Sequence, residues 1–292
     1  MAQAYMYDQG KDVWEKLGQT LEGSSTDDHF GYSVALSDKD GLTLAVGSRQ
    51  GDPNGLNEAG YVRVFSYNGT SPESPGQWMQ IGSDMTGFEA REQFGISLAL
   101  SENGRRVAVG SVGGTARNGI VRVFDFDGDW KQVGQSVKGD LDKDDANIVV
   151  MSASGSTLVI AADGDDDIAN FEGYKRTFVL EGCCLWKQVG PNITDTSRNI
   201  ALSSDASCLL EGTPSSNDKT GGGKLLRWSS IDSQWKQIAV ARGDNVGDEL
   251  GSSLAISENC SWFALGANQK SIPDLPPGYL RVYQVDDHLL IP

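Results

Sequence analysis

The chain has 292 residues, of which 38% are hydrophobic and 22% charged, and its formal net charge is −16. So acidic a chain repels nucleic-acid phosphates and anionic membrane surfaces, and binding to either is not expected. No apolar stretch approaches the about 18 residues that span a bilayer, which argues against a transmembrane segment.

The N-terminal residues begin with two predicted strands. Ala4–Asp8 has the pattern of the third strand of a repeat that fills the rest of the chain, and Trp14–Gly18 has the pattern of its fourth strand. Met1–Tyr5 shows no basic region followed by an apolar core, so no signal peptide is visible.

The first full copy of the repeat has four predicted strands. Phe30–Ser37 is an apolar strand that ends in serine, and a polar turn joins it to Leu44–Ser48. This second strand is a short apolar run, typical of a strand buried on both faces, and we expect its Gly47 to let a neighbouring backbone approach closely. Gly60–Phe65 alternates apolar and polar residues, and Trp78 opens the fourth strand. Four antiparallel strands make one propeller blade.

The same order recurs along the chain. The serines that close the first strands are Ser37, Ser101, Ser152, Ser203 and Ser257, and the tryptophans that open the fourth strands are Trp14, Trp78, Trp130, Trp186 and Trp235. A period of roughly 50 residues indicates a propeller or a solenoid. Because an aromatic side chain buries a large area, we assign the recurring tryptophans to packing between blades.

We therefore predict an all-β fold, a β-propeller of four-stranded antiparallel blades with five blades; part of a six- or seven-bladed ring is the alternative. The chain is expected to form one domain, 1–292, with repeats near 14–77, 78–129, 130–185, 186–234 and 235–292. Propellers avoid open edges by pairing strands from the two chain ends. Trp14–Gly18 is accordingly expected to be the outer strand of the blade formed by 250–285. The third strand of the repeat then occurs six times, and five blades leave no place for the extra copy, Ala4–Asp8.

The four cysteines are interpreted as free thiols. Cys183 and Cys184 are adjacent, whereas Cys208 and Cys260 fall near the first turns of successive blades. A bridge between Cys208 and Cys260 needs Cα atoms within about 7 Å, which blade geometry does not obviously provide.

Acidic residues concentrate in the loops that open on one rim of the expected propeller. These residues are Asp27, Asp28, Asp52, Glu58, Asp84, Glu89, Glu92, Asp140, Asp142, Asp144, Asp145, Asp163, Asp165, Asp166, Asp167, Asp244, Asp248 and Glu249. A rim of this charge attracts cations and basic protein surfaces. The alternative is that the charges only keep the protein dispersed.

The chain lacks the usual parts of a propeller hydrolase. A glycosidase needs paired carboxylates, expected on the innermost strands of a propeller, and the five predicted first strands contain neither Asp nor Glu. With His29 and His288 as the two histidines, we expect neither a nucleophile–histidine arrangement nor a His-rich metal site. We therefore expect no enzyme, with catalysis by loop carboxylates as the alternative.

Two acidic segments have closely spaced aspartates, which supply the several oxygen ligands that calcium takes. The candidate metal ligands are Asp140, Asp142 and Asp144 in the first segment and Asp163, Asp165 and Asp167 in the second. The first segment lacks the glycine and the closing glutamate of an EF-hand loop. An ordinary solvated loop is the alternative for both.

Phe30-Gly31 and Phe94-Gly95 open the first strands of two copies, and Leu250-Gly251 matches them loosely. Together with third strands of the form Gly-Xaa-Val-Arg-Val-Phe, this pattern resembles the FG-GAP repeats of integrin-α-like propellers over nearly the whole chain. The resemblance implies adhesion or ligand recognition at the loop rim, commonly outside the cell, with calcium in Asp-Xaa-Asp-Xaa-Asp-Gly turns. Asp38 and Asp40 keep part of that calcium pattern.

The sequence thus predicts a non-catalytic recognition or scaffold module that binds a protein or glycan partner through its acidic rim, with Ca²⁺ as the candidate cofactor. One alternative is a propeller glycoside hydrolase that uses loop carboxylates, and another is a structural subunit of a larger assembly. The sequence indicates neither the ligand nor the oligomeric state.

Overall fold

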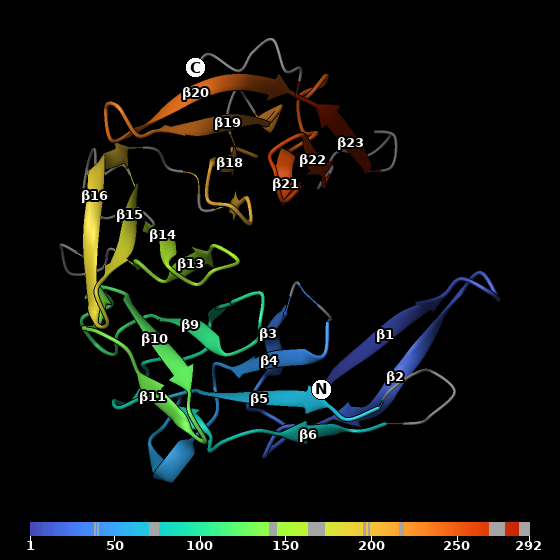
Figure 1. Cartoon of the computed structure of the whole chain (residues 1–292), viewed down its shortest axis with the longest axis vertical. Helices are drawn as coiled ribbons and strands as arrows, with labels where there is room; N and C mark the ends of the chain where they lie inside the picture. Colours follow the sequence, from blue (N-terminus) through green and yellow to red (C-terminus); the bar gives the residue numbers. More distant parts are fainter. Residues whose placement is uncertain are drawn as a thin grey trace. The chain divides into compact units, whose positions relative to one another are not determined.

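The computed structural model describes residues 1–37, 39, 41–69, 76–139, 145–162, 173–194, 197, 199–215, 219–268 and 278–285 (Figure 1). The chain is all-β, a five-bladed propeller of four-stranded antiparallel sheets, as the sequence predicts. It divides into two compact units, Met1–Val149 with Gly182–Leu185, and Val150–Glu181 with Trp186–Pro292. Each unit is described by itself.

The first unit contains a two-stranded sheet and two full blades. The strands are β1 (Ala2–Asp8), β2 (Val13–Leu21), β3 (Phe30–Leu36), β4 (Thr43–Ser48), β5 (Tyr61–Tyr67), β6 (Trp78–Gln80), β7 (Met85–Thr86), β8 (Ser97–Leu100), β9 (Arg106–Ser111), β10 (Ile120–Phe126), β11 (Trp130–Gln132) and β12 (Val137–Lys138), with a 3₁₀ turn at Pro53–Gly55. The sheets run β1-β2, β3-β4-β5-β6 and β8-β9-β10-β11, and the short strands β7 and β12 extend the pairing of β5 and β10.

The second unit continues the same blade order. Its strands are β13 (Ile148–Met151, at the boundary), β14 (Thr157–Ala162), β15 (Tyr174–Glu181), β16 (Leu185–Thr194), β17 (Asn199–Leu202), β18 (Cys208–Gly212), β19 (Gly222–Ser229), β20 (Gln234–Arg242), β21 (Leu250–Ile256), β22 (Trp262–Ala267) and β23 (Tyr279–Gln284). The sheets run β13-β14-β15-β16, β17-β18-β19-β20 and β21-β22-β23.

The N-terminal strands pair with each other. β2 lies antiparallel to β1, with Tyr7 opposite Trp14, and their rings are 5.5 Å apart. The rings of Tyr67 and Trp78, at the corresponding hairpin of the next blade, are 5.3 Å apart. The prediction that Trp14–Gly18 pairs with the strands of 250–285 is therefore wrong. Trp14–Gly18 lies in β2, which pairs with β1, the strand that a tight turn joins to it.

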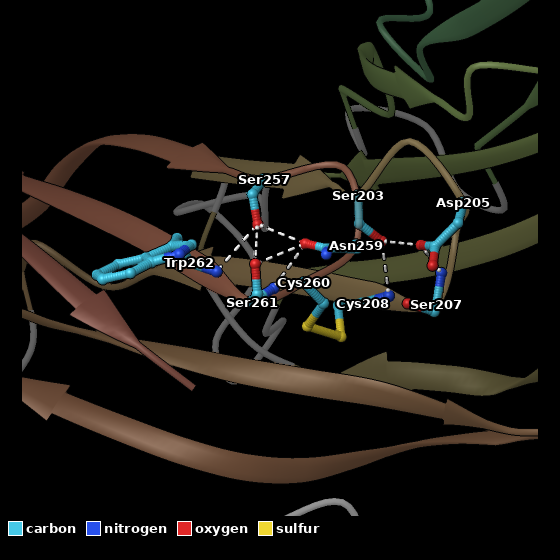
Figure 2. Close-up of a disulfide and its surroundings, with 9 residues drawn as sticks. All are labelled: Ser203, Asp205, Ser207, Cys208, Ser257, Asn259, Cys260, Ser261 and Trp262. Atoms are coloured by element: carbon cyan, nitrogen blue, oxygen red, sulfur yellow. Dashed lines mark hydrogen bonds between the residues drawn. A yellow bond between two sulfur atoms is a disulfide. The ribbon is translucent and has the colours of Figure 1, made fainter. Parts of the chain in front are cut away.

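Each recurring serine fixes the turn between the first two strands of its blade. The Ser101 hydroxyl donates to Asn103 Oδ1 at 2.9 Å and accepts from the Arg106 N–H at 3.0 Å. Ser203 does the same with Asp205 and the Cys208 N–H, at 2.6 and 2.9 Å (Figure 2). The serine therefore satisfies the backbone at the hairpin and ends the strand at a fixed position.

Glycines on the second strands allow consecutive blades to meet through backbone. A Cβ atom on Gly47 would overlap the carbonyl oxygen of Gly95 in the next blade, and one on Gly110 would overlap that of Asn147. Gly212 stands in the same relation to Gly251 in the second unit. The predicted close approach of a neighbouring backbone is confirmed, and we call each of these contacts a glycine junction.

A polar side chain of the first strand bonds the next blade beside each glycine junction. The Ser33 hydroxyl donates to the Gly95 carbonyl at 2.6 Å, and the Asn199 amide donates to the Gly251 carbonyl at 2.9 Å. The Ser97 hydroxyl accepts from the Val149 N–H at 3.1 Å. Since a buried carbonyl or N–H without a partner is costly, these bonds stabilise the junction beyond its packing.

Of the recurring tryptophans, Trp78 and Trp130 link blades, as predicted, whereas Trp14 is 69% exposed. Trp78 Nε1–H donates to the Leu17 carbonyl and Trp130 Nε1–H donates to the Ile81 carbonyl, both at 2.9 Å. Leu17 and Ile81 occupy the same position of two fourth strands. The tryptophan body supplies apolar area while its N–H positions it on the preceding blade.

The core consists of apolar clusters between blades. Val62 and Val64 of β5 pack with Phe94, Val107 and Val109 of the next blade, all buried. In the second unit the positions of Val62 and Val109 carry Lys175 and Glu211, which form an ion pair at 3.2 Å and are 0% and 1% exposed. A buried pair of this kind gains little net stability over apolar packing, but loss of one partner leaves a buried charge.

All four cysteines form disulfides, so the interpretation as free thiols is wrong. Cys208 and Cys260 join the turns of two successive blades with Cα atoms 5.9 Å apart, and both are buried (Figure 2). Cys260 has φ +64°, at the turn position where Gly104 has φ +67°. A non-glycine residue at such a φ costs conformational energy, which the disulfide offsets. Cys183 bonds its neighbour Cys184.

We predict that Gly110→Ala destabilises the fold by about 3 kcal/mol or more, because the methyl group overlaps the Asn147 carbonyl and the blades must separate. Gly10→Ala is the matched control: Gly10 is exposed and its nearest neighbour is the flexible Asp8 carboxylate. The control should change stability by no more than about 0.5 kcal/mol. Urea unfolding measures both, and equal losses would contradict the glycine junction.

Replacing Cys208 and Cys260 together with alanine should lower the free energy of unfolding by about 4 kcal/mol, since the bridge closes a chain segment with a separation of 52 residues. The Cys183→Ser, Cys184→Ser double variant is the control, because a bridge between neighbours closes almost no loop. A similar loss in both double variants, measured by urea unfolding, would refute this assignment.

Candidate functional site

Several acids of the predicted rim are buried in the loops that precede first strands. Asp28 is 3% exposed, and its Oδ2 accepts from the N–H groups of Ser24 and Ser25 at 2.7 and 3.1 Å and from Tyr61 Oη at 2.5 Å. Its Oδ1 accepts from the Phe30 N–H at 3.0 Å. The carboxylate thus holds the loop closed.

Glu92 and Asp248 repeat this arrangement. Glu92 Oε2 accepts from the Phe88 and Glu89 N–H groups at 2.6 and 3.2 Å, and Oε1 pairs with Arg122. Asp248 Oδ2 accepts from the Asp244 and Asn245 N–H groups, both at 3.0 Å, and from Tyr279 Oη at 2.6 Å.

We call Asp28, Glu92 and Asp248 the loop acids. They are 3%, 1% and 0% exposed. The prediction that they belong to a solvent-facing acidic rim is wrong, because loop carboxylates next to backbone N–H groups form turns before they attract ligands.

Burial and hydrogen bonds shift the pKa values of the loop acid Asp28 and of Tyr279, the partner of Asp248. Burial by itself would raise the pKa of Asp28, but the bonds from Tyr61 and from the N–H groups of Ser25, Phe30 and Ser24 outweigh it and hold this pKa below its usual range. Burial, together with the bond to Asp248, raises the pKa of Tyr279 to about 12.

The six aspartates predicted as calcium ligands, Asp140, Asp142, Asp144, Asp163, Asp165 and Asp167, lie outside the described residues, as do Asp38 and Asp40. Within the described residues, no group of three or more His, Cys, Asp or Glu side chains is arranged to hold a metal ion. A calcium site therefore stays a prediction.

The first unit contains a hollow of about 420 Å³ between the loops of its two full blades, which we call the rim hollow. Its lining residues are Glu58, Arg91, Gln93, Val112, Gly114, Thr115 and Arg117. A larger hollow of about 540 Å³ in the second unit is lined by Ser252, Ser253, Gly266, Ala267, Asn268, Gly278, Tyr279 and Leu280. Only the rim hollow has charged side chains among these linings, which makes it the better candidate for chemistry.

Backbone bonds between two loops build the floor of the rim hollow. Arg91 N–H donates to the Asn57 carbonyl at 2.8 Å, and Gln93 N–H donates to the Glu58 carbonyl at 3.0 Å. Glu58, Arg91, Gln93 and Arg117 all have positive φ, between 51° and 62°.

Two of these strained positions recur in the second unit. Glu249 N–H donates to the Lys219 carbonyl at 3.0 Å, as Gln93 N–H does to that of Glu58, and both residues have positive φ. The backbone conformation is therefore a property of the repeat. The side chains that it presents differ from blade to blade.

Two opposite charges of the rim hollow remain available to a ligand. Arg117 pairs with Asp145, and Arg49 Nη1 donates to Gln93 Oε1 at 3.4 Å. Across the described parts of the chain, neither the Arg91 guanidinium nor the Glu58 carboxylate has an ion pair or a side-chain hydrogen bond. Sequence reasoning counted Glu58 among the rim acids and missed Arg91, since no local pattern links residues from different blades.

No protein-family model matches this sequence, and no curated protein sequence matches it either. Solved structures match its fold. One, from Bacteroides uniformis and assigned as a 6-phosphogluconolactonase, has 11% identity and a TM-score of 0.52 over 99% of this chain and 89% of its own.

A second structure with the same assignment, from Bacteroides fragilis, has 8% identity and a TM-score of 0.55 over 99% of this chain and 74% of its own. Hydrazine synthase from Kuenenia stuttgartiensis has 11% identity and a TM-score of 0.53 over 92% of this chain and 68% of its own. At these identities the likeness shows the fold. It supports the propeller and does not support the FG-GAP class specifically.

These matches correct the prediction that the protein is a non-catalytic module and not an enzyme. That prediction rested on first strands without carboxylates, whereas propellers that match this chain over most of their length are named as enzymes. The error has a physical reason: loop side chains around a hollow can supply the groups that the strands lack.

In the part of the chain that the structure describes, no helix is long and apolar enough to cross a bilayer.

Asp28→Asn should make stability less sensitive to acid. Because the pKa of Asp28 is lowered in the folded protein, its contribution is fully present above the unfolded pKa of about 3.9 and is lost as pH falls through the folded pKa. The variant should lose about 1–3 kcal/mol at pH 7 through its impaired hydrogen bonds. The difference from wild type should shrink below about pH 4.

Asp27→Asn is the control for this experiment, since Asp27 is the exposed neighbour of Asp28. Urea unfolding at several pH values measures both variants. A loss of stability in Asp28→Asn that stayed constant from pH 7 to the acid limit would contradict the loop-acid assignment.

Proposed function

We propose that the protein is a hydrolase that opens the lactone ring of a sugar acid bearing a negatively charged group, and that the reaction takes place in the rim hollow. The observation that carries this proposal is a carboxylate, Glu58, and a guanidinium, Arg91, that line one hollow and pair with no other side chain among the described residues. The names of the Bacteroides structures, assigned as 6-phosphogluconolactonases, support the choice of substrate class.

Lactone opening needs few groups. Water attacks the carbonyl carbon, the ring C–O bond breaks, and the proton that water loses is delivered to the departing ring oxygen. We assign Glu58, which lines the hollow, to accept that proton as general base and to return it as general acid. Negative charge develops on the carbonyl oxygen in the transition state, and a hydrogen-bond donor of the lining, such as the Thr115 hydroxyl, stabilises it.

The remaining lining residues suit a polyhydroxylated ligand. The Gln93 amide and the Thr115 hydroxyl can donate and accept hydrogen bonds to sugar hydroxyls. Of the two arginines, Arg117 is 57% exposed and already faces Asp145, so it fits a position at the mouth of the hollow. We assign Arg91 to bind the anionic group of the substrate, since a guanidinium binds phosphate and carboxylate through paired N–H donors.

A glycoside hydrolase, the alternative that the sequence left open, is less well supported. Glycoside cleavage uses two carboxylates, one as acid and one as base or nucleophile. The residues that line the rim hollow include one carboxylate, Glu58, beside two guanidinium groups. One base with cationic groups fits ester hydrolysis better than acetal hydrolysis.

Glu58→Gln should lower kcat for lactone hydrolysis by about 10²–10⁴, the usual contribution of a general base. Arg91→Ala should raise KM for the phosphorylated lactone by about tenfold to a hundredfold, since a hydrogen bond to a charged group contributes about 1.5–3 kcal/mol. Acid release from gluconolactone and its 6-phosphate, measured by pH-stat and corrected for spontaneous opening, and phenol release from an aryl glycoside, measured by absorbance, test both variants.

Glu102→Gln and Arg105→Ala are matched controls, because Glu102 is an exposed turn residue and Arg105 bonds the Phe126 carbonyl away from the rim hollow. Wild-type protein that opens none of the lactones overturns the proposed activity. Opening that Glu58→Gln and Arg91→Ala leave unchanged overturns the assignment to the rim hollow. Cleavage of the aryl glycoside alone would establish the alternative reaction instead.

A further inference from the structure

The hairpin formed by β15 and β16 (Figure 1) carries an exposed disulfide at its tip. Cys183 and Cys184 are neighbours in sequence and are bonded to each other. Every residue from Glu181 to Leu185 is exposed. Gly182, which precedes the pair, has φ +63° and no atom within 4 Å of the position its Cβ would take. Solvent therefore reaches the pair freely.

The bridge closes an unusually small ring. Because the two cysteines share a peptide bond, their Cα atoms are 3.8 Å apart. Disulfides between distant residues prefer a Cα separation of about 4.4–6.8 Å. Neighbouring cysteines reach each other only in an eight-membered ring that includes the peptide group, and opening such a ring relieves its constraint.

The second disulfide of the same chain provides an internal comparison. Cys208 and Cys260 are 0% and 1% exposed, and their Cα separation of 5.9 Å lies in the preferred range. Thiol–disulfide exchange requires in-line approach of a thiolate to a sulfur atom, so access limits its rate. The two bridges should therefore differ sharply in reactivity.

We propose that Cys183–Cys184 is a thiol–disulfide exchange site for thiols in solution, a role separate from hydrolysis in the rim hollow. A thiolate attacks one of the two sulfur atoms, a mixed disulfide forms, and the bond between Cys183 and Cys184 breaks to leave the other cysteine as a thiolate. A second thiol then attacks the mixed disulfide. The products are the reduced cysteine pair and one disulfide of the reductant, so two electrons pass from two thiols to the protein.

One ion pair lies beside the tip. The acidic Glu181 side chain is paired with Lys187 across the hairpin at 3.2 Å. The Glu181 carboxylate is thus balanced by a cation. Small thiols that carry carboxylates, and exposed dithiols of redox proteins, belong to the class that can approach the tip.

The test is graded reduction of the folded, oxidised protein with reduced glutathione or dithiothreitol, followed by alkylation and peptide mass spectrometry. We expect alkylation of Cys183 and Cys184 at reductant concentrations at least tenfold below those that label Cys208 and Cys260. The melting temperature should not change in the first step and should fall in the second, since both cysteines of the tip are exposed whereas the buried bridge joins two blades.

Two double variants separate the steps. Cys183→Ser with Cys184→Ser should abolish the step at low reductant, and Cys208→Ala with Cys260→Ala should retain it. Labelling of both pairs at the same reductant concentration overturns the proposal. So does labelling of Cys183 and Cys184 in the oxidised protein without reductant, because the bridge would then be absent in solution.

Discussion

Contact between backbones of successive blades is the constraint on which this fold depends. At Gly47, Gly110 and Gly212 a second strand meets a carbonyl of the next blade at a distance that excludes any side chain. This approach brings the sheets close enough for Val62 and Val64 to become fully buried against the next blade. It also sets the reach of the tryptophan N–H groups, which span from one fourth strand to the preceding one. Burial of apolar side chains then stabilises the close packing of blades that the glycines permit.

The same constraint builds the rim. When a first strand enters against the preceding blade, the loop before it must pair with the loop of that blade, and Gln93 and Glu249 do so in left-handed conformations with Glu58 and Lys219. Backbone atoms alone define this geometry, so the side chains at the rim are free to differ. The repeat therefore supplies a scaffold of constant shape, and function resides in the variable residues that it presents.

Features that recur at a fixed spacing were predictable from the sequence, and features that join two blades were not. The serine turns, the junction glycines and the packing tryptophans each have one physical role repeated along the chain. Arg91 and Glu58, by contrast, come together only because consecutive loops pair. The disulfide between Cys208 and Cys260 depends on the distance between two turns. The loop acids look solvated in sequence, because nothing local shows which carboxylates receive N–H donors.

The second unit has replaced uniform packing with specific links. Before copy four, Lys175 pairs with Glu211 where the first copies pack valine side chains. Copy five has Leu250 where the first two copies have phenylalanine, and a disulfide joins its turn to the preceding blade. A smaller residue at the junction buries less area and specifies the neighbour less well. A buried charge is stable only beside its opposite charge, and a disulfide joins one pair of blades covalently. Both links therefore specify which blades are neighbours where apolar packing specifies it less well.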